Sequence, residues 1–241
     1  MERTECFPER GLNSLQFCLS TAALTVTVDP VPDVQLIISG DQPDHVHITH
    51  QSGSLRVSQK GDPRSVNSVR LMLPQGWKGA LHAFSLCGDI SISQFAGSDL
   101  TLHSAWGNVC GERITCISAD VRTLRGAVAL SGLTGDRCHI RTLGGQVILS
   151  GCSFPTRRLS ALHARAELEL LNPFDTHSIR CLTGSTTVYA PLTSADAALT
   201  SVKGRLLTDG VSVQSDAPRI RMLSVTADLQ VIASLDDQAM I

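Results

Sequence analysis

Apolar and small polar residues alternate along most of the chain, and glycine interrupts the alternation at a constant interval. Gly88, Gly107, Gly126 and Gly145 are 19 residues apart, and each lies in a short phrase like residues 87–92, CGDISI. Weaker copies of the phrase follow with spacings of 21, 18, 20 and 23 residues, at Ala166, Gly184, Gly204 and Ala227. The pattern predicts about eight repeating coils between residues 80 and 233.

Positions counted from these anchors form columns of similar residues, and four columns are expected to face inward. The column two residues before the anchor has no polar member: Leu86, Ala105, Leu124, Leu143, Ala164, Leu182, Val202 and Val225. The column two residues after it contains Ile90, Val109, Val128, Val147, Leu168, Thr186, Leu206 and Leu229. Five residues before it are Ala83, Leu102, Val121, Ile140, Ala161, Ile179, Leu199 and Met222, and seven after the first four are Phe95, Ile114, Leu133 and Cys152.

Two further columns are typical of corners between strands. The glycine anchors Gly88, Gly107, Gly126, Gly145, Gly184 and Gly204 are expected to stack, because glycine reaches positive φ and allows backbones to approach closely. Side chains with a hydroxyl that can hydrogen-bond to the local backbone recur three residues before the anchors, at Ser85, Ser104, Thr123, Thr142, Ser201 and Ser224.

A coil of this kind cannot bury its apolar side alone, so the coils are expected to stack around one continuous core. The sequence therefore predicts an all-β parallel β-helix, or β-solenoid, with about eight regular coils of ~19–20 residues. Residues 1–78 are expected to form irregular β-rich coils and a cap, with strands at 24–28, 34–39, 45–49, 55–58 and 68–73. Residues 79–241 form the regular coils of the same elongated domain.

Composition narrows the classes of function. Twenty Lys and Arg stand against 22 Asp and Glu, which gives a formal net charge of −2 and no polycationic footprint for nucleic acid. No apolar stretch is long enough for a transmembrane segment, and residues 1–8 do not resemble a secretory signal. We therefore expect a cytoplasmic protein, with the cell envelope as the alternative location.

Cysteine and histidine raise the question of metal sites. The eight cysteines contain no CxxC pair and fall in different columns, so we expect reduced thiols, with Cys138 and Cys152 as small core residues. His45 and His47 would share one face of a strand, with His50 on the other. They either bind a metal ion or simply form the outer face opposite Val46 and Ile48. The second interpretation needs no ligand, and we expect no metal and no cofactor.

Catalytic signatures are weak. Residues just after the anchors alternate in character and do not gather carboxylates, aromatic residues make up 4% of the chain, and no GxSxG motif occurs. We expect a protein that is not an enzyme; a glycan-active β-helix enzyme is the weaker alternative.

One outward column is unusual. His103, Arg122 and Arg141 lie four residues before consecutive anchors, and Arg125 lies three residues further round its coil. Like charges stacked one coil apart repel each other. Solvation by water can relieve this repulsion, and so can an acidic partner surface or a bound anion. This column is the candidate for an anion-binding or partner-binding surface.

The repeated glycine phrase, together with residues 52–55 (SGSL) and 71–74 (LMLP), resembles the bacterial "putative adhesin" family of β-strand-repeat proteins. The resemblance covers roughly residues 20–233. It implies a right-handed parallel β-helix of unassigned function, often tied to the cell envelope, and it supplies no catalytic residues. Two functions follow: a non-catalytic scaffold for protein interactions, or an envelope-associated binder of a glycan or anionic polymer.

The ends of the stack predict self-association. Residues before Leu24 are numerous enough to cover the first coil, whereas few residues follow the last one, which ends near Val231. We expect a homodimer through the C-terminal end or through a sheet face.

Overall fold

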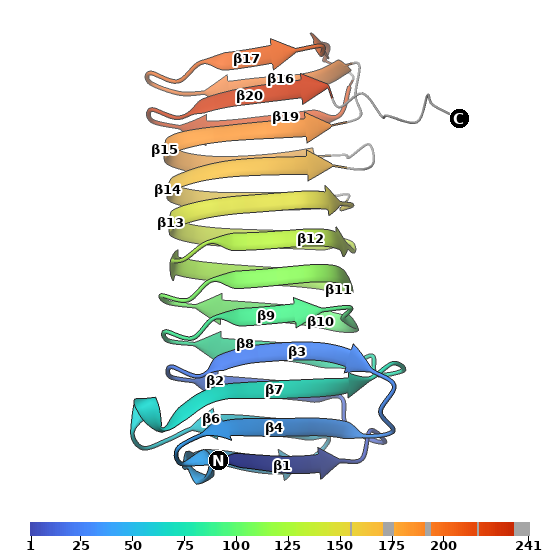
Figure 1. Ribbon diagram of the computed structural model, residues 1–241. Coiled ribbons are helices and arrows are strands. Elements are labelled where there is room, and N and C mark those ends of the chain that lie inside the picture. Colours follow the sequence, from blue (N-terminus) through green and yellow to red (C-terminus); the bar gives the residue numbers. More distant parts are fainter. Residues whose placement is uncertain (155, 171–175, 191–193, 216, 234–241) are drawn as a thin grey trace, which may run out of the picture.

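The computed structural model describes residues 1–154, 156–170, 176–190, 194–215 and 217–233 (Figure 1). Among these residues it is all-β, with two short 3-10 turns, η1 (Pro43–His45) and η2 (Pro63–Ser65), and no α-helix. No helix in the described ranges is long and apolar enough to span a membrane.

The strands of the first half are β1 (Glu2–Phe7), β2 (Ser14–Leu19), β3 (Ala23–Asp29), β4 (Val34–Gly40), β5 (Val46–Gln51), β6 (Ser54–Gln59), β7 (Val66–Pro74), β8 (Ala80–Ser85), β9 (Ile90–Ser93) and β10 (Ala96–Ser104). The remainder are β11 (Val109–Arg125), β12 (Val128–Thr134), β13 (Arg137–Cys152), β14 (Thr156–Leu170), β15 (Thr176–Ala190), β16 (Ser194–Thr200), β17 (Leu206–Asp209), β18 (Ser212–Val213), β19 (Arg219–Ser224) and β20 (Asp228–Ala233). The five strands expected before residue 78 correspond to β3–β7.

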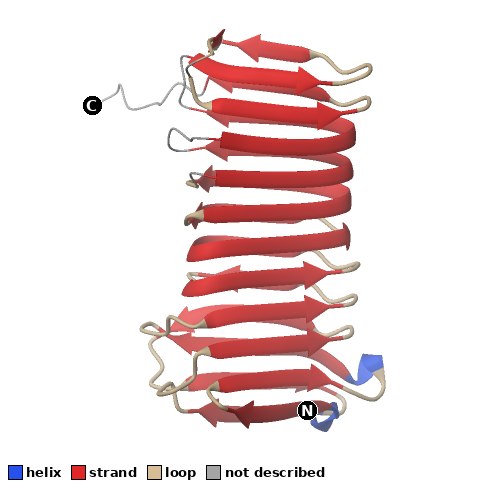
Figure 2. Ribbon diagram, turned by 180° about the vertical axis from the view of Figure 1, so that it is seen from behind, coloured by secondary structure: helices blue, strands red, loops and turns tan. Residues whose placement is uncertain are grey.

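The strands form a large mixed sheet in which they lie one above another in two stacks (Figures 1 and 2). The first stack runs β5–β6–β2–β8–β10–β11–β13–β14–β15–β19–β16. The second runs β1–β4–β7–β3–β9–β11–β12–β13–β14–β15–β20–β17. Strands β11 and β13–β15 are long enough to take part in both stacks.

Most pairs are parallel, and their register repeats the interval of the sequence. Val109 lies opposite Val128 and Val128 opposite Val147, 19 residues apart each time. The described antiparallel pairs, β1–β4, β4–β7 and β5–β6, are at the N-terminal end, where β1 covers the edge of β4.

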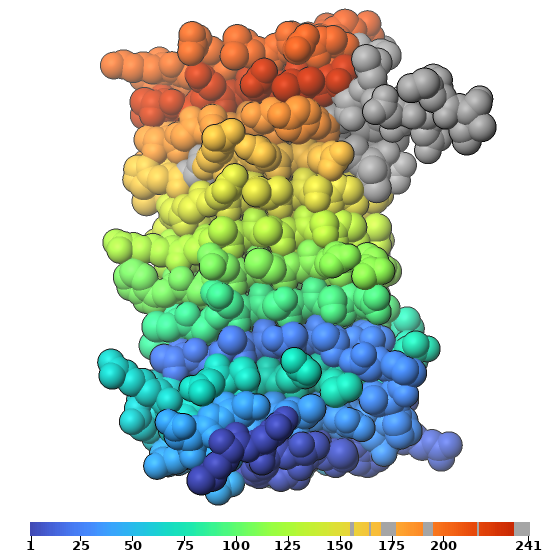
Figure 3. Space-filling model, in the orientation of Figure 1, coloured from blue at the N-terminus to red at the C-terminus, as the bar shows by residue number. Residues whose placement is uncertain are grey.

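Layer order departs from chain order at both ends, which the sequence did not predict. Strands β2 and β3 lie between the layer of β6 and β7 and the layer of β8 and β9. Strands β19 and β20 lie between β15 and the layer of β16 and β17, as the red layer beneath orange ones shows in Figure 3. The prediction that residues near Val231 form the last coil is therefore wrong: Val231 is buried in β20, and β17 lies beyond it.

A single core of aliphatic side chains fills the space between the stacks. Three of the predicted inward columns are confirmed, since their members are buried or, at Ala161, Leu199 and Leu206, partly buried against the core. The glycine column is confirmed as a stack of close contacts. A Cβ on Gly126 would lie 2.3 Å from the carbonyl oxygen of Gly107, and one on Gly107 would lie 2.2 Å from that of Gly88. Close approach is the main reason for glycine here, because only Gly145 and Gly184 of these anchors have positive φ.

The hydroxyl column is also confirmed. Ser104 Oγ accepts a hydrogen bond from the amide of Gly107 at 2.9 Å, and Ser201 Oγ accepts one from the amide of Gly204 at 2.8 Å. Thr142 donates to the carbonyl of Gly144 at 3.0 Å. These side chains are mostly buried at the corner beside the glycines.

The column two residues before the anchors was predicted to face inward, and this prediction is wrong. Seven of its eight members, with Leu162 in place of Ala164, form a continuous outward row. The Leu and Val residues of the row are 39–76% exposed: Leu86, Leu124, Leu143, Leu162, Leu182, Val225 and Val202, with Ala105 between the first two. We call it the leucine row. The cause is strand alternation: the hydroxyl column takes the inward position at the corner, so the next residue must point outward.

The fifth anchor was also misplaced. Gly145 pairs with Ala164, and Ala164 pairs with Gly184, so the anchor is Ala164 and not Ala166. The error leaves the inward columns intact because a shift of two residues keeps every side chain on the same face.

Two basic side chains point into the core from neighbouring layers. Arg157 on β14 lies opposite Cys138 on β13 and opposite His177 on β15, and both Arg157 and His177 are 2% exposed. Burial, and then the nearby Arg157 charge, lower the pKa of His177 to about 3. Burial raises the pKa of the Cys138 thiol to about 12, and Cys138 and Cys152 are core residues as expected.

Candidate anion-binding face

The outward surface of the first stack carries the predicted basic column. His103 on β10 lies opposite Arg122 on β11, and Arg122 lies opposite Arg141 on β13. The same column continues through Ser160 on β14 to Arg180 on β15. The structure therefore brings His103, Arg122 and Arg141 together and extends their column by two layers.

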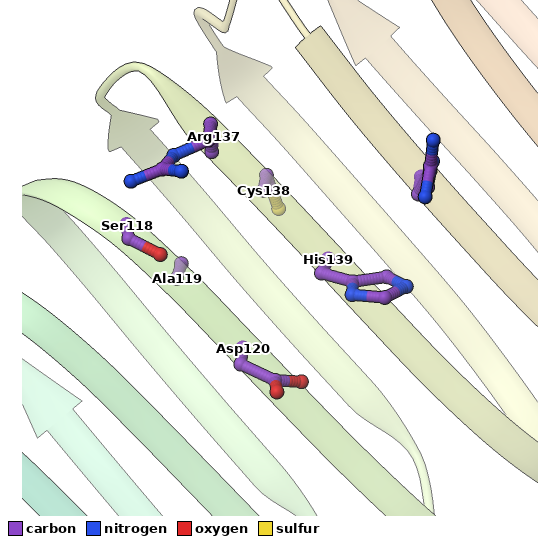
Figure 4. A pocket seen from close by; sticks show the side chains of 7 residues that line it. Ser118, Ala119, Asp120, Arg137, Cys138 and His139 are labelled. Carbon is purple, nitrogen blue, oxygen red and sulfur yellow. The ribbon is translucent and has the colours of Figure 1, made fainter.

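A second outward column lies two residues earlier on each strand. Asp120, His139, Arg158 and Ser178 follow one another in register from β11 to β15. Figure 4 shows Asp120 on one strand and His139 on another, with Arg137 further along the same strand as His139. We call the two columns, with Arg137, the arginine face.

Carboxylates neutralise only part of this face. Arg122 donates two hydrogen bonds to Asp120, at 3.0 and 2.5 Å. Burial alone would raise the pKa of Asp120, but the hydrogen bond and charge of Arg122 outweigh it and lower that pKa. Among the described residues, no carboxylate lies within ion-pair distance of the other arginines of the face: Arg137, Arg141, Arg158 and Arg180.

Three of these arginines surround a shallow hollow of about 350 Å³. Its lining is His139, Arg141, Arg158, Ser160, Ser178 and Arg180, which contains hydrogen-bond donors and no carboxylate. Since layers are ~4.8 Å apart, Arg141 and Arg180 lie about 10 Å apart with Ser160 between them. Guanidinium groups bind carboxylate, sulfate and phosphate oxygens in a bidentate way, and serine hydroxyls can add further donors. The arrangement suits an anionic group.

The two histidines of the face are uncharged at neutral pH. Burial, followed by the charge of Arg122, lowers the pKa of His103, and burial followed by Arg141 lowers that of His139. His139 Nε2 accepts a hydrogen bond from Arg141 at 3.3 Å, which also requires an unprotonated nitrogen. The positive charge of the face at pH 7 is therefore that of its arginines.

The leucine row borders the arginine face. A shallow groove between them is lined by Arg122, Arg141 and Arg180 on one side and by Leu124, Leu143 and Leu162 on the other. Arg125, the fourth predicted residue, lies beyond the leucine row, where its guanidinium stands 4.9 Å from the ring centre of Trp106. Arg125 therefore faces the row from the opposite side.

Arg137, Arg158 and Arg180 were missed from the sequence. The signal was present for Arg180, because 19 and then 20 residues after Arg141 lead to Ser160 and Arg180. Arg180 is also four residues before the anchor Gly184, so the column rule includes it; the misplaced fifth anchor interrupted the column one layer earlier, where it put Leu162 in place of Ser160.

Two of the histidines near the N-terminal end lie on different elements. His45 belongs to η1 and its Nδ1 lies 2.9 Å from Ser65 Oγ, whereas His47 is exposed on β5. In the part of the chain that the structure describes, no group of three or more His, Cys, Asp or Glu residues could hold a metal ion.

Comparison with known proteins relates the chain to others through its fold. No family model matches, and no curated protein matches. The fold is similar to that of a protein described as a putative adhesin from Bacteroides fragilis, with a TM-score of 0.59, 13% identity and 97% of each chain covered. A putative adhesin from Parabacteroides distasonis gives a TM-score of 0.51 at 10% identity, over 95% of this chain and 97% of that one. At such identities the likeness establishes a shared fold.

Proposed function

We propose that the chain is a right-handed parallel β-helix of the "putative adhesin" type, and that it acts as a non-catalytic, envelope-associated binding module. The arginine face binds an anionic polymer such as an acidic glycan. The stack serves as a rigid scaffold that holds the arginines at fixed intervals.

The unpaired arginines around the hollow carry this proposal. Arg141, Arg158 and Arg180 converge on one hollow without a carboxylate partner among the described residues. Three unneutralised charges held this close repel, and a bound anion would relieve the repulsion. The layer spacing of ~4.8 Å also repeats along the stack, which suits a ligand that itself repeats charged groups.

The fold and the solved structures that share it are consistent with this function. The solved structures with the same fold are described as putative adhesins. Parallel pairing at intervals of 19 residues supports the β-helix, since each layer is then one repeat of the sequence. A scaffold for protein partners is the second candidate, favoured by the exposed leucine row.

The test is binding of fluorescently labelled heparin, a model acidic glycan, measured by anisotropy against labelled neutral dextran. We expect heparin binding that weakens with salt, and no dextran binding. Because each charge-assisted hydrogen bond contributes about 1.5–3 kcal/mol, the variant Arg141→Ser/Arg158→Ser/Arg180→Ser should bind about 100-fold more weakly, allowing for non-additivity.

Arg70→Ser is the matched control, because Arg70 is an exposed arginine on β7 in the second stack. It should bind heparin like the wild type. Equal binding by the triple variant, or equal affinity for dextran, would refute the proposed function.

A further inference from the structure

The leucine row is unlike the other outward columns of the stack. The outward column that follows the anchors contains Asp89, Asn108, Ala127, Gln146, Arg165, Ser185, Asp228 and Arg205, which is a mixed polar surface. The leucine row instead places Leu or Val at seven of eight consecutive layers, over a length of roughly 34 Å at ~4.8 Å per layer. A straight exposed apolar row of this length marks an interaction surface.

Both neighbouring columns are basic or neutral. On one side are Phe84, His103, Arg122, Arg141, Ser160, Arg180, Leu223 and Thr200, and on the other Cys87, Trp106, Arg125, Gly144, His163, Thr183, Thr226 and Lys203. Neither column contains a carboxylate. The row is therefore an apolar line with cations on both flanks.

This charge pattern discriminates among three occupants: a second copy, a soluble polyanion and an anionic lipid surface. A second copy packed row against row would bring arginines opposite arginines, which is unfavourable. A soluble polyanion would satisfy the arginines and leave the leucines in water. An anionic lipid surface satisfies both, because its phosphates lie at the depth of the flanking cations and its first methylene groups lie at the depth of the row.

Trp106 fits the same geometry. It is half exposed beside the row, and its ring lies under the Arg125 guanidinium. Tryptophan prefers the boundary between headgroups and acyl chains, where the ring is apolar and the indole N–H stays hydrated.

We propose that the leucine row and its basic flanks dock the protein lengthwise on an anionic lipid surface. Phosphates bind Arg141 and Arg180 on one flank and Arg125 on the other, while Leu124, Leu143 and Leu162 enter the acyl boundary. This inference rests on the proposed function and adds an anionic membrane surface as a second anionic partner of the arginine face.

The test measures cosedimentation of the full chain with vesicles of phosphatidylglycerol and phosphatidylcholine, and with phosphatidylcholine alone. We expect binding to the anionic vesicles only. Leu143→Ser/Leu162→Ser should lose at least 10-fold in vesicle affinity and keep its heparin affinity. Arg141→Ser/Arg180→Ser should lose both. Leu207→Ser, at an exposed leucine on β17 outside the row, is the matched control and should change neither.

Tryptophan fluorescence provides a second measurement on the unaltered protein. The chain has two tryptophans, of which Trp77 is buried and Trp106 is exposed, so a blue shift on addition of anionic vesicles reports Trp106. Trp106→Phe should abolish the shift.

The outcomes separate the two proposals. Heparin binding without vesicle binding, no blue shift, or vesicle binding that survives in the leucine variant would overturn the lipid inference and leave the proposed function standing. Failure to bind either heparin or vesicles would overturn both.

Discussion

Replacing the buried arginine of β14 should make the protein more stable. Arg157 is 2% exposed, and its three guanidinium nitrogens have no hydrogen-bond partner within the described part of the chain. Burial lowers the pKa of Arg157, because removing the charged guanidinium from water costs free energy. Methionine has a similar length and no charge, so Arg157→Met keeps the packing and removes the buried cation.

The magnitude follows from two opposing contributions. Burying an ion costs several kcal/mol after relaxation, whereas the ring of Phe154, 5.7 Å from the guanidinium carbon, returns about 0.5–2 kcal/mol. A net penalty of about 1–4 kcal/mol remains, so we expect Arg157→Met to raise the free energy of unfolding by that amount. For a chain of this size each kcal/mol corresponds to about 2–4 °C in Tm.

Calorimetry or thermal circular dichroism at pH 7 measures the effect, with Arg158→Met as the control. Arg158 is the next residue on the same strand, points outward and is exposed, so its replacement should change stability by less than about 0.5 kcal/mol. A lower Tm for Arg157→Met, with Arg158→Met unchanged, would refute the reasoning, because the guanidinium would then be compensated inside the core.

Two further predictions concern pH and self-association. The pKa of His177 is about 3 in the folded state and ~6.5 in the unfolded chain, so the unfolded state binds more protons in this window and stability falls as pH falls below ~6.5. At pH 5 the loss due to His177 should be roughly 2 kcal/mol, and denaturant titrations at pH 7 and pH 5 should show that His177→Leu lacks it; an unchanged pH dependence would contradict the assignment. Strand β17 pairs with β20 on one side and with no described strand on the other, so we expect end-to-end dimers in the micromolar range by light scattering. Thr208→Pro on that edge should give a monomer, and a persistent dimer would exclude the end as the interface.

The fold was largely predictable because the period of the sequence equals the register of the strands. The 19-residue interval of the glycines reappears in the pairing of Val109, Val128 and Val147. What the interval cannot encode is which layer lies next to which. Any two copies of the phrase pair equally well, so the position of β20 between β15 and β17 depends on tertiary packing.

The candidate site was half predictable for a related reason. His103, Arg122 and Arg141 follow the strict interval and were found, whereas Arg180 lies beyond Ala164, an anchor without glycine. Hydrophobicity alone predicts a buried position for the leucine row, whereas strand alternation predicts an exposed one. Leu124 follows the inward Thr123, so strand geometry alone places it outside.

The interleaved ends affect how the molecule is made and shortened. A segment synthesised early, β2 and β3, completes its pairing only when β6 to β9 have emerged, and β16 and β17 must leave room for strands that follow them. Removing residues 1–30 would therefore delete an internal layer of the stack. The layer of β6 and β7 and the layer of β8 and β9 would each lose a pairing partner. Fraying from a chain terminus is hindered in the same way, because β2, β3, β19 and β20 each have neighbours above and below. Strands β2 and β3, like strands β19 and β20, connect layers that are distant from them in sequence. Loss of either layer should therefore unfold the neighbouring layers cooperatively.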